Sequence, residues 1–237
     1  MNTYTGIPSE GLFLLSRNKF ENSKEFYEAH KAQLKAQVFT PLMQIVEDLA
    51  EDFTKLDPRM NLLPGRIISR ARRDTRFTKE KHLYRDTIWI TFTRPKEEPM
   101  VWPCMWFEVK PEEGEWNAGV CVYAAEPAYM QFLRPRIEKD AEAFLSAANE
   151  AIKAGAEMMP EAFKRDKYPD APVRLKPYLN AKSFIFMHTS KDMALLAQPE
   201  LIDELRGLYS AYGAMYQWLQ AAAEAYFARL GGERGDA

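Results

Sequence analysis

The chain contains the stretch Thr87-Ile88-Trp89-Ile90-Thr91-Phe92-Thr93, whose even-numbered residues are isoleucine or phenylalanine and whose odd-numbered residues are threonine or tryptophan. An alternation of period two is typical of a strand with one face in the core. The same period recurs in residues 104–109 and 117–123, which a turn at 112–115 separates. Because the connections after Thr93 are too short for crossover helices, we expect these strands to be antiparallel.

Residues 1–60 are helical in pattern, because apolar side chains recur at three- and four-residue spacing, and we interpret them as core-packing scaffold. Ser9 and Ser23 stand where two of these helices would begin, and a serine hydroxyl is a preferred N-cap. Pro41 interrupts the pattern, which predicts either a kinked helix or two consecutive helices. Beyond this region we expect a first strand at Ile67–Arg72.

The second half of the chain returns to helical spacing. We expect a helix over 127–155, then an ordered Pro-rich loop, then a short strand and a long helix over 183–230, with a frayed tail at 231–237. The switch from period 3.6 to period 2 and back predicts an α+β fold in a single domain. Its central sheet, over 65–125, should be mostly antiparallel, with four to five strands flanked by N-terminal and C-terminal helices.

The composition excludes several classes of protein. With 237 residues, of which 46% are hydrophobic and 28% charged, and a mean hydropathy of −0.43, the chain is not disordered, fibrous or membrane-spanning. The net charge of −2 argues against a surface built for a long nucleic-acid duplex. The N-terminus shows no signal-peptide pattern, which predicts a soluble cytoplasmic protein. Nothing in the sequence sets its oligomeric state.

The chain has only two cysteines, Cys104 and Cys121, and three dispersed histidines, so we expect no metal site and no cofactor. A hairpin that turns at Glu113-Gly114 would pair Cys104 with Tyr123 and leave the two cysteines diagonal to each other. Diagonal Cβ atoms are too far apart for an unstrained disulfide. Both thiols are therefore expected to stay reduced.

One segment, residues 66–85, concentrates positive charge: it holds eight Lys and Arg residues and only two acids. Six of the eight are arginine, whose planar guanidinium binds carboxylate or phosphate through two hydrogen bonds. A loop that gathers several of them around one point would bind a small anion, with Asp74 and Phe77 shaping the loop. The alternative is an internal network of ion pairs with Asp74, Asp86, Glu108 and other acids of the neighbouring helices.

The same segment resembles a family signature. Residues 70–85 read RARRDTRFTKEKHLYR, which is similar to the pattern R-x-x-R-D-x-R-F-S-K-D-K-x-P-Y-K of the domain-of-unknown-function family 2461. The residues that match directly are Arg70, Arg73, Asp74, Arg76, Phe77, Lys79, Lys81 and Tyr84. The order of helices and strands around the motif is similar too, so the resemblance covers most of the chain. It implies an uncharacterised bacterial protein of one domain and supplies no reaction.

A second candidate site is the polar and aromatic face of the predicted sheet. Its members are Thr87, Trp89, Thr91, Trp106, Glu108, Asn117, Cys121 and Tyr123. Such a mixture suits a small-ligand site. The alternative is a face that the C-terminal helix covers, with Trp106 and Tyr123 packed beneath it. His82 and Tyr84 are candidates for acid–base chemistry, yet no sequence motif identifies a reaction.

Two functions follow from these candidates. The first is a binding protein or enzyme for a small phosphorylated or carboxylated ligand, held by Arg70, Arg73, Arg76, Lys79, Lys81, Tyr84, Trp106, Glu108 and Tyr123. The second is a non-enzymatic interaction module whose basic loop docks an acidic protein partner or a nucleic-acid end. A pocket that encloses Arg70, Arg73 and Arg76 would favour the first function, and an exposed patch would favour the second.

Overall fold

The structure, a computed structural model, describes residues 3–76, 81–95, 102–122, 125–159 and 161–235, with side chains up to residue 230. Within it the chain forms two compact units. Unit 1 contains Met1–Phe92, Trp106–Ala118 and Thr189–Gly207, and unit 2 contains Thr93–Met105, Gly119–His188 and Leu208–Ala237.

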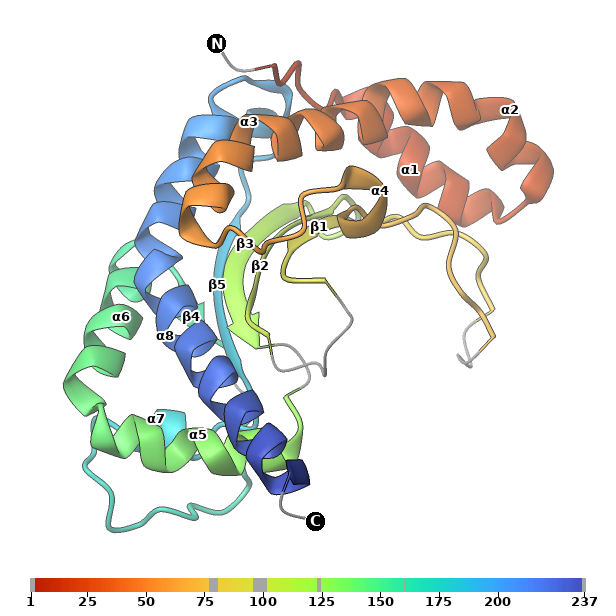
Figure 1. Cartoon of the computed structure of the whole chain (residues 1–237). Helices are drawn as coiled ribbons and strands as arrows, with labels where there is room; N and C mark the ends of the chain where they lie inside the picture. The colour runs from red at the N-terminus through yellow and green to blue at the C-terminus, as the bar shows by residue number, and fades with distance from the viewer. Residues whose placement is uncertain (1–2, 77–80, 96–101, 123–124, 160, 236–237) are drawn as a thin grey trace. The chain divides into compact units, whose positions relative to one another are not determined.

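The N-terminal helices of unit 1, red to orange in Figure 1, are α1 (Ser9–Glu21), α2 (Lys24–Leu34) and α3 (Thr40–Leu56). Ser23 caps α2 as predicted, since its hydroxyl accepts a hydrogen bond from the Phe26 amide at 3.0 Å. Ser9 does not cap α1, because Pro8 holds the extended N-cap position and Ser9 is already helical. The fixed φ of Pro8 favours a helix that begins directly after it.

The helices α2 and α3 are joined by a π-helical turn, η1 (Lys35–Phe39), and Pro41 lies in the first turn of α3. A proline has no amide hydrogen to donate to the preceding turn of a helix. The missing hydrogen bond accounts for the wider turn directly before the proline. The chain is otherwise helical from Lys24 to Leu56. Of the two arrangements predicted around Pro41, consecutive helices are the one observed.

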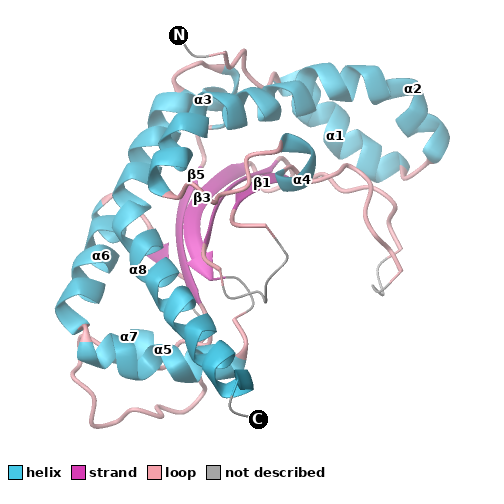
Figure 2. Cartoon of the chain, viewed as in Figure 1, coloured by secondary structure: helices cyan, strands magenta, loops and turns pink. Residues whose placement is uncertain are grey.

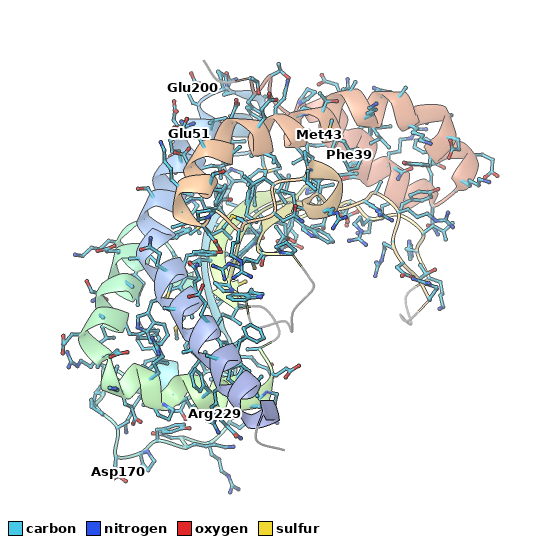
Figure 3. All side chains as sticks on the ribbon, viewed as in Figure 1. Phe39, Met43, Glu51, Asp170, Glu200 and Arg229 are labelled. Carbon is cyan, nitrogen blue, oxygen red and sulfur yellow. The ribbon has the colours of Figure 1, made fainter. Side chains whose placement is uncertain are left out.

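The apolar side of α3 packs on strand β1 (Ile88–Phe92). Phe53 stacks on Phe92 with ring centroids 4.0 Å apart, and both side chains are buried. All three even-numbered side chains of β1 are fully buried, as the alternation of period two predicted. The other side of α3 carries exposed residues, among them Met43 and Glu51 (Figure 3).

The prediction of a regular strand at Ile67–Arg72 is wrong. A short helix, α4 (Pro64–Ile67), takes its start, because a proline at the first helical position has the φ that a helix requires. The residues after α4 form two isolated antiparallel bridges, Ile68 with Ile90 and Arg72 with Tyr84. From Ile68 to Arg72 the chain advances by four residues, whereas from Tyr84 to Ile90 it advances by six. Because the two spacings are unequal, a bulge replaces a continuous ladder.

The strands form a five-stranded antiparallel sheet in the order β1-β2-β3-β5-β4, magenta in Figure 2. The other strands are β2 (Cys104–Lys110), β3 (Glu115–Val122), β4 (Glu157–Met158) and β5 (Phe184–Ser190). β4 has no counterpart in the sequence prediction, because two residues carry no periodicity. The predicted α+β fold with a central antiparallel sheet of four to five strands is confirmed.

The β2–β3 hairpin differs in register from the sequence prediction. Its turn occupies the four residues Pro111–Gly114, so Cys104 lies opposite Cys121. The predicted pairing of Cys104 with Tyr123 is wrong by two residues, and Tyr123 itself lies outside the described residues. The physical reason is Gly114, whose φ of 60° makes it the last residue of a four-residue turn and not the second of a two-residue turn.

The helices of unit 2 are α5 (Pro127–Lys139), α6 (Ala141–Lys153), α7 (Lys176–Leu179) and the part of α8 (Leu201–Gly235) from Leu208 onward. Two helices take the place of the single helix expected over 127–155. Asp140 leaves the helical conformation between them, and aspartate favours such breaks because its side chain competes for backbone hydrogen bonds. Across the described residues, no helix combines the length and the hydrophobicity that crossing a lipid bilayer requires.

Arg134 of α5 holds the Pro-rich loop of unit 2. Its side chain is buried, its Nε donates to the Leu179 carbonyl at 2.8 Å, and its Nη2 donates to the Ala181 carbonyl at 2.9 Å. The guanidinium also lies over the rings of Phe163 and Tyr168, at 5.2 and 5.8 Å from their centroids. This one side chain thus ties a segment with little regular structure to α5.

Candidate anion-binding site

The basic segment folds back on itself just before β1. The amides of Arg73 and Arg85 donate to carbonyl oxygens across the fold-back at 2.8 and 3.1 Å. The result is a short antiparallel pairing of residues 71–73 with residues 83–85, which we call the arginine arm. The arm belongs entirely to unit 1.

Alternate residues of the arginine arm lie on opposite faces. Arg72 is bridged to Tyr84, so these two residues share one face. Arg73 and Arg85 each lie one position further along and share the other face. The pairing therefore places Arg85 on the same face as Arg73.

On this second face the Arg85 guanidinium is half-buried and stacks on an aromatic ring. Its Cζ lies 4.6 Å from the centroid of the Trp89 ring. Burial, and then the positive charge of Arg73, lower the pKa of Arg85. The Nε of Arg85 is buried, and no atom of the described residues accepts its hydrogen. Two cations are therefore neighbours here, and no described carboxylate pairs with Arg85.

The acids that could have neutralised these arginines have other partners. Asp86 is buried and forms an ion pair with Lys19, whose Nζ lies 3.1 Å from its Oδ1. Glu108 faces Asn117 at 3.5 Å and Lys110 at 4.0 Å. Burial raises the pKa of Glu108, and the positive charge of Lys110 opposes that rise. Each of these two acids thus has a lysine close to it.

Arg76 forms an ion pair beyond the end of the arm. Its Nη2 donates to Asp74 Oδ2 at 2.6 Å and its Nε donates to Asp74 Oδ1 at 2.9 Å, with both side chains exposed. These hydrogen bonds lower the pKa of Asp74 to about 2. Lys81 Nζ donates to the Thr75 carbonyl at 3.0 Å. For Arg76 the geometry supports the ion-pair alternative.

Two contacts fix the arm to the N-terminal helices. Tyr84 is 2% exposed and stacks on Tyr27 of α2 with ring centroids 4.9 Å apart, and burial raises its pKa. Asn22 Oδ1 accepts a hydrogen bond from the Leu83 amide at 2.7 Å. Sequence reasoning missed Asn22, although asparagine after a helix often adopts the left-handed φ observed here, 46°.

The remaining candidates differ in where they lie. Phe77, Lys79 and Tyr123 lie outside the described residues, and Arg70 and His82 are exposed. Trp106 is half-buried on β2.

The polar face of the sheet is tied together by Asn117, which is fully buried. Its Oδ1 accepts a hydrogen bond from Thr189 Oγ1 at 2.7 Å, and its side-chain amide lies 3.5 Å from Glu108 Oε2 and 3.4 Å from Glu115 Oε1. These contacts link β3 to β2 and to β5. In the described residues this part of the face is an internal hydrogen-bond network.

A groove between α1 and α2 was also missed by sequence reasoning. It encloses about 400 Å³, and its lining includes Glu10, Phe13, Arg17 and His30. The His30 Nδ1 lies 2.8 Å from the Phe26 carbonyl oxygen, so this hydrogen bond involves Nδ1 and not Nε2. Helical spacing in residues 1–60 predicted scaffold, and spacing alone does not reveal that Phe13 is 70% exposed.

Among the described residues, no cluster of three or more His, Cys, Asp or Glu side chains could hold a metal ion. What the site offers chemically is therefore positive charge: guanidinium groups on a braced backbone, one of them stacked on an indole ring.

The fold and the arm define a class of protein, an α+β protein with an antiparallel sheet and an arginine-rich arm before its first strand. The chain belongs to the family described as conserved hypothetical protein (DUF2461), whose model matches residues 11–218. The family predicted from the sequence is confirmed by this match, which covers most of the chain. No curated protein and no solved structure matches the chain.

Proposed function

We propose that the Arg73 and Arg85 face of the arginine arm binds a small phosphorylated or carboxylated ligand. One observation carries the proposal: two neighbouring guanidinium groups share a face, and the half-buried one has no acidic partner among the described residues. Like charges repel, and an anion between them relieves that repulsion. A guanidinium stacked on Trp89 keeps its N–H edge available for a carboxylate or phosphate in its own plane.

The rigidity of the arm supports the same proposal. Tyr84 and Asn22 fix its backbone to the N-terminal helices, and the Arg85 guanidinium lies over the Trp89 ring, so part of the site is ordered before a ligand arrives. Groups that are ordered in advance lose less entropy when they bind. Exposed cations around the arm, Arg72 among them, attract anions from a distance.

Isothermal titration calorimetry with inorganic phosphate and with citrate tests the proposal. Arg85→Met keeps an apolar stem against Trp89 and removes the charge. We expect this variant to bind the better of the two anions at least about tenfold more weakly, because a hydrogen bond to a charged group contributes about 1.5–3 kcal/mol.

Arg70→Met is the matched control, because Arg70 is an exposed arginine of the same segment that lies outside the arm. Its affinity should stay within about twofold of the unmodified protein, since solvent and salt screen the charge of an exposed side chain. The small-ligand site is contradicted if neither anion binds the unmodified protein, or if both variants lose affinity equally.

The exposure of Arg70, Arg72, Arg76 and Lys81 favours a second function, docking of an acidic protein partner or a nucleic-acid end. Fluorescence anisotropy with a labelled polyglutamate peptide and a labelled single-stranded oligonucleotide tests it. Diffuse electrostatic binding predicts an affinity that falls steeply with salt and falls by a similar factor for each Arg→Met variant. Loss confined to Arg85→Met would count against this second function.

A further inference from the structure

The two cysteines of the chain lie opposite each other on neighbouring strands of unit 2. Cys104 begins β2, and Cys121 is the penultimate residue of β3. Their Sγ atoms are 3.2 Å apart, close enough for one thiol to donate a hydrogen bond to the other. Both residues are buried, with 8% and 4% of their surfaces exposed. The expectation that the cysteines would be too far apart for a bridge is therefore wrong.

We propose that Cys104 and Cys121 form an intramolecular disulfide, with a small hydroperoxide as the two-electron oxidant. A disulfide has an S–S bond of about 2.05 Å, so the sulfur atoms must approach by about 1.2 Å. Opposite positions of an antiparallel pair hold Cβ atoms about 4.5–5.5 Å apart, and a disulfide takes about 3.5–4.5 Å. Side-chain rotation and a small strand adjustment are enough to close the bond.

The surroundings favour oxidation over metal binding. No third His, Cys, Asp or Glu side chain among the described residues completes a metal site, and zinc takes at least three protein ligands. Cys104 keeps slight exposure to solvent, so a small hydroperoxide suits the pair better than a protein oxidant, whose active site needs a larger opening. The hydrogen bond with Cys104, together with burial, raises the pKa of Cys121, so little Cys121 thiolate is present at neutral pH and the disulfide forms slowly.

The chemistry takes two steps. The Cys104 thiolate attacks one oxygen of hydrogen peroxide, an S–O bond forms, the O–O bond breaks, and the departing hydroxide combines with the thiol proton as water. The Cys121 thiolate then attacks the sulfenic acid sulfur, an S–S bond forms, the S–O bond breaks, and hydroxide again leaves as water with the second thiol proton. Two thiols are oxidised, and one peroxide is reduced to two water molecules.

The full chain, first reduced and then treated with hydrogen peroxide, tests the proposal. Free thiols counted under denaturing conditions should fall from two per chain to none, the intact mass should fall by two hydrogen atoms, and dithiothreitol should restore both values. Cleavage after glutamate cuts the turn at Glu112 and Glu113. Without reduction, the peptides that carry the two cysteines should remain linked after that cleavage.

The matched controls are Cys104→Ser and Cys121→Ser, each of which keeps a single thiol. Peroxide should add oxygen atoms to that thiol or link two chains, and it should not remove two hydrogen atoms from one chain. The proposal is overturned if the unmodified chain keeps both thiols, gains oxygen, or forms only linked dimers. The decisive measurement uses the unmodified protein, so a variant that fails to fold does not weaken the test.

Discussion

At the scale of single residues, Arg134 carries more of the structure than its position in the sequence suggests. It is buried and donates to two backbone carbonyls, so its loss leaves both without a donor. An unsatisfied buried polar group costs about 1–3 kcal/mol, and we expect Arg134→Met to lower the free energy of unfolding by about 2–4 kcal/mol in urea denaturation. In the control Arg174→Met, an exposed ion pair with Glu142 is lost, which should cost at most about 1 kcal/mol. Equal losses would contradict the role of Arg134.

Asp74 supplies a prediction about pH. Its pKa is about 2 in the folded protein because Arg76 donates to its carboxylate, whereas an unpaired aspartate has a pKa of about 3.9. Since the folded-state pKa is the lower one, the ion pair stabilises the fold above about pH 3.9, and its contribution disappears as the pH falls towards 2. An NMR titration of the Asp74 carboxyl should show a midpoint near 2, and Arg76→Met should raise it towards the ordinary value. A midpoint that the substitution does not move would show that Arg76 is not the cause.

At the scale of elements, the contact of α3 with β1 organises the core of unit 1. Phe53 stacks on Phe92 there, and both are buried. We expect Phe92→Ala to lower the free energy of unfolding by about 3–5 kcal/mol, because it leaves a cavity in the core. Phe13→Ala removes the same side chain from a surface position that is 70% exposed, and should cost at most about 0.5 kcal/mol. Similar losses in the free energy of unfolding of the two variants would show that the α3–β1 contact does not dominate the stability of unit 1.

At the scale of the whole molecule, single-domain organisation stays a prediction. β2, β3, β5 and α8 each contribute residues to both compact units, so four of the five passages of the chain between the units fall within regular elements, and the fifth directly follows β1. We therefore expect one cooperative unfolding transition. Calorimetry together with tryptophan fluorescence checks this, because both probes should report the same midpoint. Two separated transitions would mean that the units unfold independently. A cytoplasmic location and a bacterial origin also stay predictions.

The sequence by itself determined the α+β class, the buried face of β1 and the family. Each depends on patterns within a few residues: a period of two or of 3.6, or a motif such as residues 70–85. Local patterns were insufficient where one residue sets a turn or a helix break. Gly114 sets the register of the β2–β3 hairpin, and Asp140 separates α5 from α6.

Only the tertiary structure shows which side chains become neighbours. The hairpin register sets Cys104 against Cys121, and the fold-back of the arginine arm sets Arg85 beside Arg73. Lys19, some 65 residues away in sequence, is the partner of Asp86. Such pairings depend on which chain segments meet and on competition among charges for the same carboxylate. No local pattern records that outcome, because the competing residues become neighbours only after the chain has folded.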